Sequence, residues 1–187
     1  MPTKLKGMSG EEFAKKVIAG ERDFSKIEIL PWKGTGLHYP AGNFKYDFNN
    51  DGYDLMEKLR GLQEKLETNP IVIDGSDFSN IIANGLEIPY LRAIETNFKN
   101  SWLLNSNFSY GVFTGADFTS ADLENVNFHS AEFHEANFEY ANLKYARNLR
   151  YAGNLETAIY EFTKITPDCE EIIQDELSKR RLFIVEK

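Results

Sequence analysis

The stretch ADFTS-ADLEN-VNFHS-AEFHE-ANFEY-ANLKY, residues 116–145, repeats every five residues and decides the fold. The third position of each five holds Phe or Leu, and this anchor recurs without a gap from Phe98 to Leu143. Two positions before most anchors stands a small residue, and the residue between the two is usually polar. The ten anchors are Phe98, Leu103, Phe108, Phe113, Phe118, Leu123, Phe128, Phe133, Phe138 and Leu143.

A period of five fits neither the 3.6 residues of a helical turn nor the alternation of a strand, so it indicates a repeat architecture. The small residue and the anchor are two apart and point inward, as they would on a strand, while the polar residue between them points outward. Each five then forms a short side and a corner, and four corners close a coil of 20 residues. Leu103, Leu123 and Leu143 would form one column of a stack whose other columns are Phe, which favours a four-sided coil.

These A(D/N)(L/F)xx repeats resemble the pentapeptide-repeat family over about residues 73–146, and more weakly near residues 20–29. The resemblance implies a mainly β fold, a right-handed quadrilateral β-helix. It implies little about function, because most members of the family lack an assigned biochemical role. A minority resemble DNA in shape and charge and bind type II topoisomerases such as gyrase.

We expect residues 1–187 to form a single domain. Residues 9–29 predict an amino-terminal capping helix and a first partial coil, because a β-helix end needs a cap over its unpaired backbone. Residues 30–70 interrupt the repeat with a Pro- and Gly-rich loop and a helical apolar stripe over 53–67, and they predict an inserted arm. Such insertions often lie on a binding face, although this arm could simply pack on the coil.

The repeat phase resumes near Ile73, and we expect the β-helix coils to span 71–147. Residues 148–187 predict carboxyl-terminal helices. The first is expected over 155–163 because of its apolar spacing, and the second begins at Thr166-Pro167, an N-cap followed by proline. The apolar run 182–185 either docks on the domain or gives a homodimer contact, so the chain is expected to be a monomer or a homodimer through these helices.

The first of these coils departs from the repeat at three anchors. Ala83, Ile88 and Ala93 stand where a Phe or Leu belongs, and their inward partners Ile81, Leu86 and Leu91 are large. We therefore expect the two inward positions to exchange volume, so that the interior of this coil stays filled.

Composition limits the possible functions. The chain has 187 residues, a formal charge of −8 and one cysteine, Cys169. The negative charge disfavours direct binding to nucleic acid, and a single cysteine allows no intramolecular disulfide. No apolar run is long enough to span a membrane, and the start lacks the apolar core of a signal peptide. We expect a cytoplasmic protein without membrane contact.

Two outward features are candidate partner sites. Trp102 and Leu104 flank an anchor and form an apolar patch, which the arm or a terminal helix would cover unless a partner uses it. The second feature is the set of outward carboxylates, which sit on different faces and favour a solvated surface over a DNA-like acidic stripe. These carboxylates are Asp117, Asp122, Glu124, Glu132, Glu135 and Glu139. The corner tyrosines Tyr110, Tyr140 and Tyr145 could contact a partner or only stack.

No enzyme motif stands out, because GxGxxG, GxxxxGK, HExxH and GxSxG are all missing. His129 and His134 straddle a corner without a third ligand, and Cys169 has no evident base partner. We expect no catalytic residue, metal or cofactor. The leading interpretation is a non-enzymatic protein-interaction or scaffold module with an unidentified protein partner. The alternative is a DNA-mimicking protein that binds a type II topoisomerase such as gyrase.

Overall fold

The computed structural model describes residues 6–9, 12, 16, 23, 25, 27–30, 67–68, 70–86 and 88–185. Its named elements are β1 (Lys6–Ser9), β2 (Ile27–Leu30), the 3-10 helices η1 (Leu149–Tyr151) and η2 (Leu155–Thr157), and α3 (Pro167–Val185). Strands β1 and β2 form a parallel pair in which Lys6 lies opposite Ile27. The predicted capping helix 10–19 and the predicted arm 30–70 lie outside the described residues except at isolated positions.

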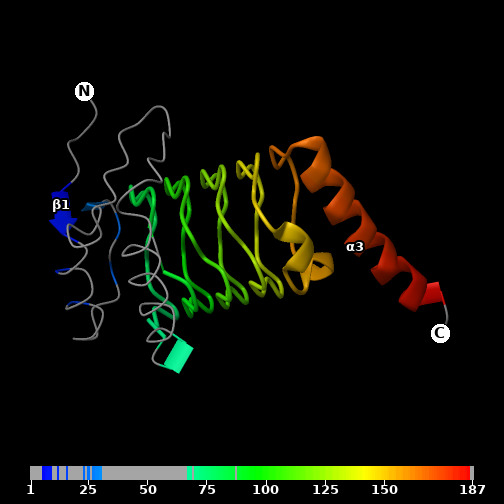
Figure 1. Cartoon of the computed structure of the whole chain (residues 1–187), viewed down its shortest axis with the longest axis horizontal. Coiled ribbons are helices and arrows are strands. Elements are labelled where there is room, and N and C mark those ends of the chain that lie inside the picture. Colours follow the sequence, from blue (N-terminus) through cyan, green and yellow to red (C-terminus); the bar gives the residue numbers. More distant parts are fainter. Residues whose placement is uncertain are drawn as a thin grey trace, which may run out of the picture.

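The repeats form stacked coils of 20 residues, which appear in Figure 1 as a row of loops from green to yellow. Each outward residue makes a parallel bridge with the residue 20 positions away, as in the pairs Asn97 with Asp117 and Trp102 with Asp122. The backbone N–H of Phe118 donates to the carbonyl of Asn137 at 2.8 Å, one coil further along. The predicted four-sided β-helix is therefore confirmed in its coil length and stacking.

Each corner is turned by one residue in the left-handed conformation. Asn105 and Tyr110 have φ of 59°, and Gly115 has φ of 63°. Glycine and asparagine adopt this conformation at low cost, which explains why Asn is frequent at this position. Tyrosine has no such preference, so the hydrogen bonds of the ladder must hold Tyr110 in place.

The interior consists of ordered columns of anchors. Phe118 stacks between Phe98 and Phe138 with ring centroids 4.9 and 5.2 Å away and interplanar angles of 3° in both contacts. Adjacent columns meet edge to face, as at Phe128 and Phe133, whose rings are 5.0 Å apart at 85°. All ten predicted anchors are buried, with at most 2% of each side chain exposed. The predicted core is confirmed.

The exchange of volume predicted in the first coil is confirmed for two of its three pairs. Ala83 and Ala93 are buried, and so are their large partners Ile81 and Leu91, whereas Leu86, the partner of the buried Ile88, is only half-buried. The exchange is not perfect, because an apolar cavity remains in this coil. It is lined by Ile73, Phe78, Ile81, Leu86, Ile88, Leu91, Phe98, Leu103 and Phe108.

The end of the coil differs from the sequence prediction. The helix predicted over 155–163 is wrong, because only Leu155–Thr157 forms a helical turn. The boundary predicted at residue 147 is wrong as well, because Ile159 still bridges Asn137 and Lys164 still bridges Asn142. The cause is a change of period: η1 and η2 replace two tight corners, so bridged residues become 21 and then 22 positions apart.

Tyr160 shows how the core continues into this last coil. Its ring stacks on Phe138 at 5.6 Å and 8°, so it extends the column of Phe98, Phe118 and Phe138. Its hydroxyl donates to the carbonyl of Leu155 at 3.0 Å. Burial is the main cause that raises the pKa of the Tyr160 phenol far above its ordinary value, so the hydroxyl stays a donor.

Helix α3 begins at Pro167, as predicted, and contacts η1 and η2. Its first turns dock on the last coil through Cys169 and Ile173, which are 3% and 2% exposed. Thr166 donates its hydroxyl to the Cys169 sulfur at 3.3 Å. The start of the helix thus packs on the coil. The side chains of the apolar run 182–185 lie outside the described part of the chain, so both its docking on the domain and the homodimer contact remain predictions.

Candidate partner-binding surface

The outward residues define four faces, which are named here by the residues that bridge along each. Face A carries Val72, Arg92, Val112 and Glu132; face B carries Asp77, Asn97, Asp117, Asn137 and Ile159. Face C carries Ile82, Trp102, Asp122, Asn142 and Lys164; face D carries Asn107, Asn127 and Arg147. The predicted site residues lie on faces A, B and C and at their corners, so the structure does not gather them into one site.

The predicted apolar patch lies on face C. Trp102 is 56% exposed. The predicted arm lies outside the described residues, so its covering of Trp102 stays a prediction. Leu104 is half-buried at the following corner, and its N–H donates to the Asn84 side-chain oxygen at 3.0 Å. Trp102 thus presents a large ring on a backbone that bridges hold from both sides.

The carboxylate of Asp117 on face B is engaged in local contacts. It accepts hydrogen bonds from the Thr119 N–H and hydroxyl, and Lys99 Nζ lies 2.9 Å from its second oxygen. Burial alone would raise the pKa of Asp117, but the hydrogen bonds from Thr119 and Lys99 outweigh burial and lower the pKa. This carboxylate therefore stabilises the coil and is not a free acidic group.

Most of the remaining predicted carboxylates also have local hydrogen-bond or ion-pair partners. On face C the Asn142 amide donates to Asp122 at 3.0 Å and to Glu124 at 3.2 Å. On face A the Asn154 amide donates to Glu132. At the next corner Glu135 lies 3.7 Å from His134 Nε2. Glu139 lies at the corner after face B, where its charge adds to that of Asp117 in raising the pKa of Lys99.

We expect a measurable pH effect from the Asp117 contact. A carboxyl group whose pKa is lowered by folding adds stability above its unfolded pKa, near 3.8, and this stability is lost as the pH falls through the folded pKa. Asp117→Asn should therefore flatten the acid-side fall in unfolding free energy by less than about 1 kcal/mol, because Lys99 is exposed. Urea unfolding at neutral pH and below pH 3.8 measures this effect.

The control for this experiment is Glu161→Gln, since Glu161 is exposed and no side-chain hydrogen bond or ion pair of Glu161 is found in the described part of the chain. This variant should retain the wild-type pH profile. If the unfolding free energy of Asp117→Asn depended on pH as that of the wild type does, the stabilising role given to the Asp117 carboxylate would be contradicted.

Sequence reasoning missed the surface at face D and its corner toward face A. An aromatic ladder runs along this corner: Tyr90 stacks on Tyr110 at 4.8 Å, Tyr110 meets His129 at 5.4 Å, and His129 meets Tyr151 at 5.1 Å. The 20-residue spacing of Tyr90 and Tyr110 was a readable signal. The place of Tyr151 was not, because Tyr151 is the last residue of η1, which replaces a regular corner of the coil.

No cluster of three or more His, Cys, Asp or Glu residues suited to a metal ion occurs among the described residues. Within the same part of the chain, no helix is long and apolar enough to cross a membrane.

Comparisons with known proteins agree with the repeat pattern. A family model for pentapeptide repeats, in eight copies, matches residues 94–129 and 112–147. A crystal structure of the pentapeptide repeat protein Rfr23 from the cyanobacterium Cyanothece 51142 is similar at 18% identity and a TM-score of 0.41, covering 54% of this chain and 63% of that chain. The similarity thus spans less than two thirds of Rfr23.

Two trypsin-treated variants of QnrB1, a plasmid-mediated fluoroquinolone resistance protein, also match. They share 8% and 11% identity, cover 57% of this chain in both cases and 68% and 88% of their own, and have TM-scores of 0.17 and 0.15. A search of curated protein sequences gave no match. Residues 94–147 are therefore similar to the pentapeptide-repeat family, in agreement with the repeat motif read from the sequence.

Proposed function

We propose that this protein is a non-enzymatic protein-interaction module whose partner binds the outward surface of the coil. The observation that carries this proposal is the set of large aromatic side chains held exposed on a regular backbone. Trp102 is 56% exposed, Tyr145 63% and Phe162 70%. The inward side chains from Phe98 to Leu143 are buried against one another, so a partner would have to use the outward positions.

Exposed aromatic residues of this kind favour a protein partner. Tyr and Trp are enriched among the residues that contribute most to protein interfaces. Trp102 and Phe162 also sit on backbone that is fixed by the coil, since Trp102 bridges two neighbours and Phe162 occupies a left-handed corner at φ 56°. A rigid presentation lowers the entropy cost of binding.

Affinity capture from the native host, followed by mass spectrometry, tests this proposal. The bait proteins are the wild type, Trp102→Ala, Phe162→Ala and the exposed control Ser120→Ala, each checked for folding by circular dichroism. We expect at least one protein to be retained by the wild type and by the Ser120→Ala control and lost from one aromatic variant. The absence of any specifically captured protein would contradict the proposal.

The alternative is a DNA mimic that binds a type II topoisomerase such as gyrase, and the charge of −8 is what favours it. A mimic would need carboxylates spaced along one face as phosphates are on DNA. On face B, however, Asp117 is paired with Lys99 and its bridged neighbours Asn97 and Asn137 are uncharged. We therefore keep the interaction module as the leading proposal.

We expect no inhibition of gyrase in a supercoiling assay at about micromolar protein, a concentration that would detect a binder of ordinary affinity. Inhibition that disappears in the double variant Asp117→Asn and Asp122→Asn would contradict this expectation and favour the mimic.

A further inference from the structure

Face D differs in charge from the rest of the protein. The chain has a formal charge of −8, yet three segments that carry face D and its corner toward face A contain no Asp or Glu, whereas the corner toward face C carries Glu124 and Lys144 and position 87, outside the described residues, is Glu in the sequence. These segments are 105–110, 125–130 and 145–151, and their only charged residues are Arg147 and Arg150. A neutral-to-basic strip on an acidic protein requires a physical explanation.

Both arginines are exposed and have no carboxylate partner within ion-pair distance among the described residues. Arg147 stands in the outward position that bridges Asn127, and its Nε–H donates to the backbone carbonyl of Asn125 at 3.2 Å. This hydrogen bond positions the guanidinium without neutralising it. Arg150 is held in η1, directly before Tyr151.

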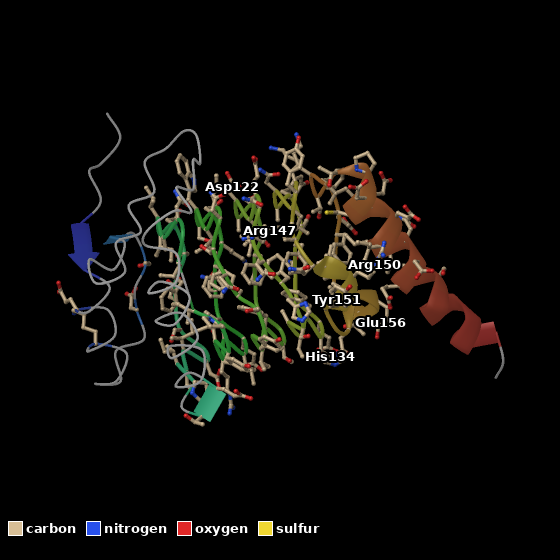
Figure 2. The ribbon with its side chains drawn as sticks, viewed as in Figure 1. Asp122, His134, Arg147, Arg150, Tyr151 and Glu156 are labelled. Carbon is tan, nitrogen blue, oxygen red and sulfur yellow. The ribbon has the colours of Figure 1, made fainter. Side chains whose placement is uncertain are left out.

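The surroundings of the arginines are aromatic and polar, with Asp122 and Glu156 at the edges (Figure 2). Figure 2 looks onto this side of the coil and places Arg147 and Tyr151 between Asp122, above, and His134, below. Tyr151 is 60% exposed and contacts His129, so its ring is supported by the aromatic ladder described above. Neighbouring Asn side chains hydrogen-bond to one another along the face, as Asn127 does to Asn107 at 3.0 Å.

We propose that face D, through Arg147, Arg150 and Tyr151, binds a short acidic segment of a partner protein. The guanidinium group forms a planar fork that matches a carboxylate, and Arg and Tyr are the residue types that most often contribute to interface energy. Binding would supply the carboxylates that these arginines lack. This inference rests on the proposed function, because it names the chemistry of the partner.

The acidic residues on the faces beside face D argue against nucleic acid as the occupant. A nucleic acid carries a charge at every phosphate and extends beyond the patch, so it would be repelled by the carboxylates of the adjacent faces. Asp122 and Glu132 lie on the two faces that border face D. A short acidic segment can place its carboxylates on the arginines alone.

Fluorescence anisotropy with a fluorescein-labelled peptide rich in Asp, Glu and Leu tests the proposal on the full chain. The control peptide carries Asn and Gln in place of the acids. We expect Arg147→Glu and Arg150→Glu each to weaken binding of the acidic peptide by about tenfold or more, as the loss of a charge-assisted contact does. The matched control Lys164→Glu makes the same charge change on face C and should alter the affinity by less than about threefold.

Several outcomes would overturn this inference. They are equal binding of the acidic and neutral peptides, no binding by the folded wild type, or equal losses in Arg147→Glu and Lys164→Glu. Tighter, arginine-dependent binding of a labelled single-stranded oligonucleotide would overturn it in favour of nucleic acid. If the acidic peptide does not bind but capture of a host protein still depends on Trp102, this inference is contradicted and the proposed function stands. If no host protein is captured either, the proposed function is contradicted as well.

Discussion

Replacing Phe118 with alanine should lower the free energy of unfolding by about 3–5 kcal/mol. The Phe118 ring is fully buried and lies between Phe98 and Phe138 in a nearly parallel stack. Its edge also meets Phe113 at 5.6 Å. The neighbouring coils cannot collapse into the space left by the ring, because the ladder hydrogen bonds fix the distance between coils. The free-energy cost of the cavity therefore adds to the loss of buried apolar surface.

Urea denaturation followed by circular dichroism measures this loss. The matched control is Trp102→Ala, which removes an even larger ring from an outward position that is 56% exposed. The control should change the unfolding free energy by only about 0.5 kcal/mol, as surface substitutions usually do. A loss of less than about 1 kcal/mol for Phe118→Ala would contradict the inward register.

The second large effect is expected from Ala136→Leu, which should cost about 1–3 kcal/mol or more by overpacking. Ala136 is fully buried two residues before Phe138, in the position that the repeats keep small. Every neighbouring inward position is already filled, so three extra carbon atoms would have to displace stacked rings. Val126 is buried at the equivalent position, which shows that moderate bulk is tolerated at one point in the stack but not that leucine would be.

The control for this variant is Ala136→Ser, because the repeats themselves use serine here. Ser101, at the equivalent position, is buried and donates its hydroxyl to the Phe98 carbonyl at 2.6 Å. In Ala136→Ser the corresponding acceptor is the Phe133 carbonyl, so the new hydroxyl has a partner and the change should cost less than about 1 kcal/mol. Equal thermal stability of the Leu and Ser variants would contradict tight packing at this position.

The regular core could be predicted from the sequence because its rule is local and repeats without interruption. Anchors such as Phe118 and small residues such as Ala136 identify themselves by a spacing of two within every five residues. The substitution of large for small residues at Ile81 and Leu91 was predictable for the same reason. One inward position had lost volume, and its neighbour had gained it.

The last coil could not be predicted because its local pattern fits two structures. Leu155 and Ile159 have helical spacing, and Asn154 is a plausible N-cap. In the structure Asn154 instead adopts the left-handed conformation at φ 59°, and Ile159 joins the bridge ladder. Long-range pairing with the preceding coil outweighs the local helical preference. That pairing cannot be read from the sequence once the period lengthens from 20 to 22 residues.

The candidate site was predictable only in part, for a related reason. Outward residues such as Trp102 follow from the register alone, and its exposure agrees with the predicted apolar patch. The patch at Arg147 and Tyr151 depends on which residues lie beside them across coils. That information requires the position of η1, which the five-residue rule does not contain.

A disulfide between cysteines at positions 137 and 159 tests the stacked coil most directly. Asn137 and Ile159 are 22 residues apart and bridge each other, so their Cα atoms lie at about the 4.8 Å spacing of neighbouring strands, within the range that a disulfide spans. We predict that the Asn137→Cys, Ile159→Cys variant cross-links under mild oxidation, while Asn137→Cys, Lys164→Cys does not. No cross-link in the first variant, or equal cross-linking in both, would contradict a coil that continues through residue 164.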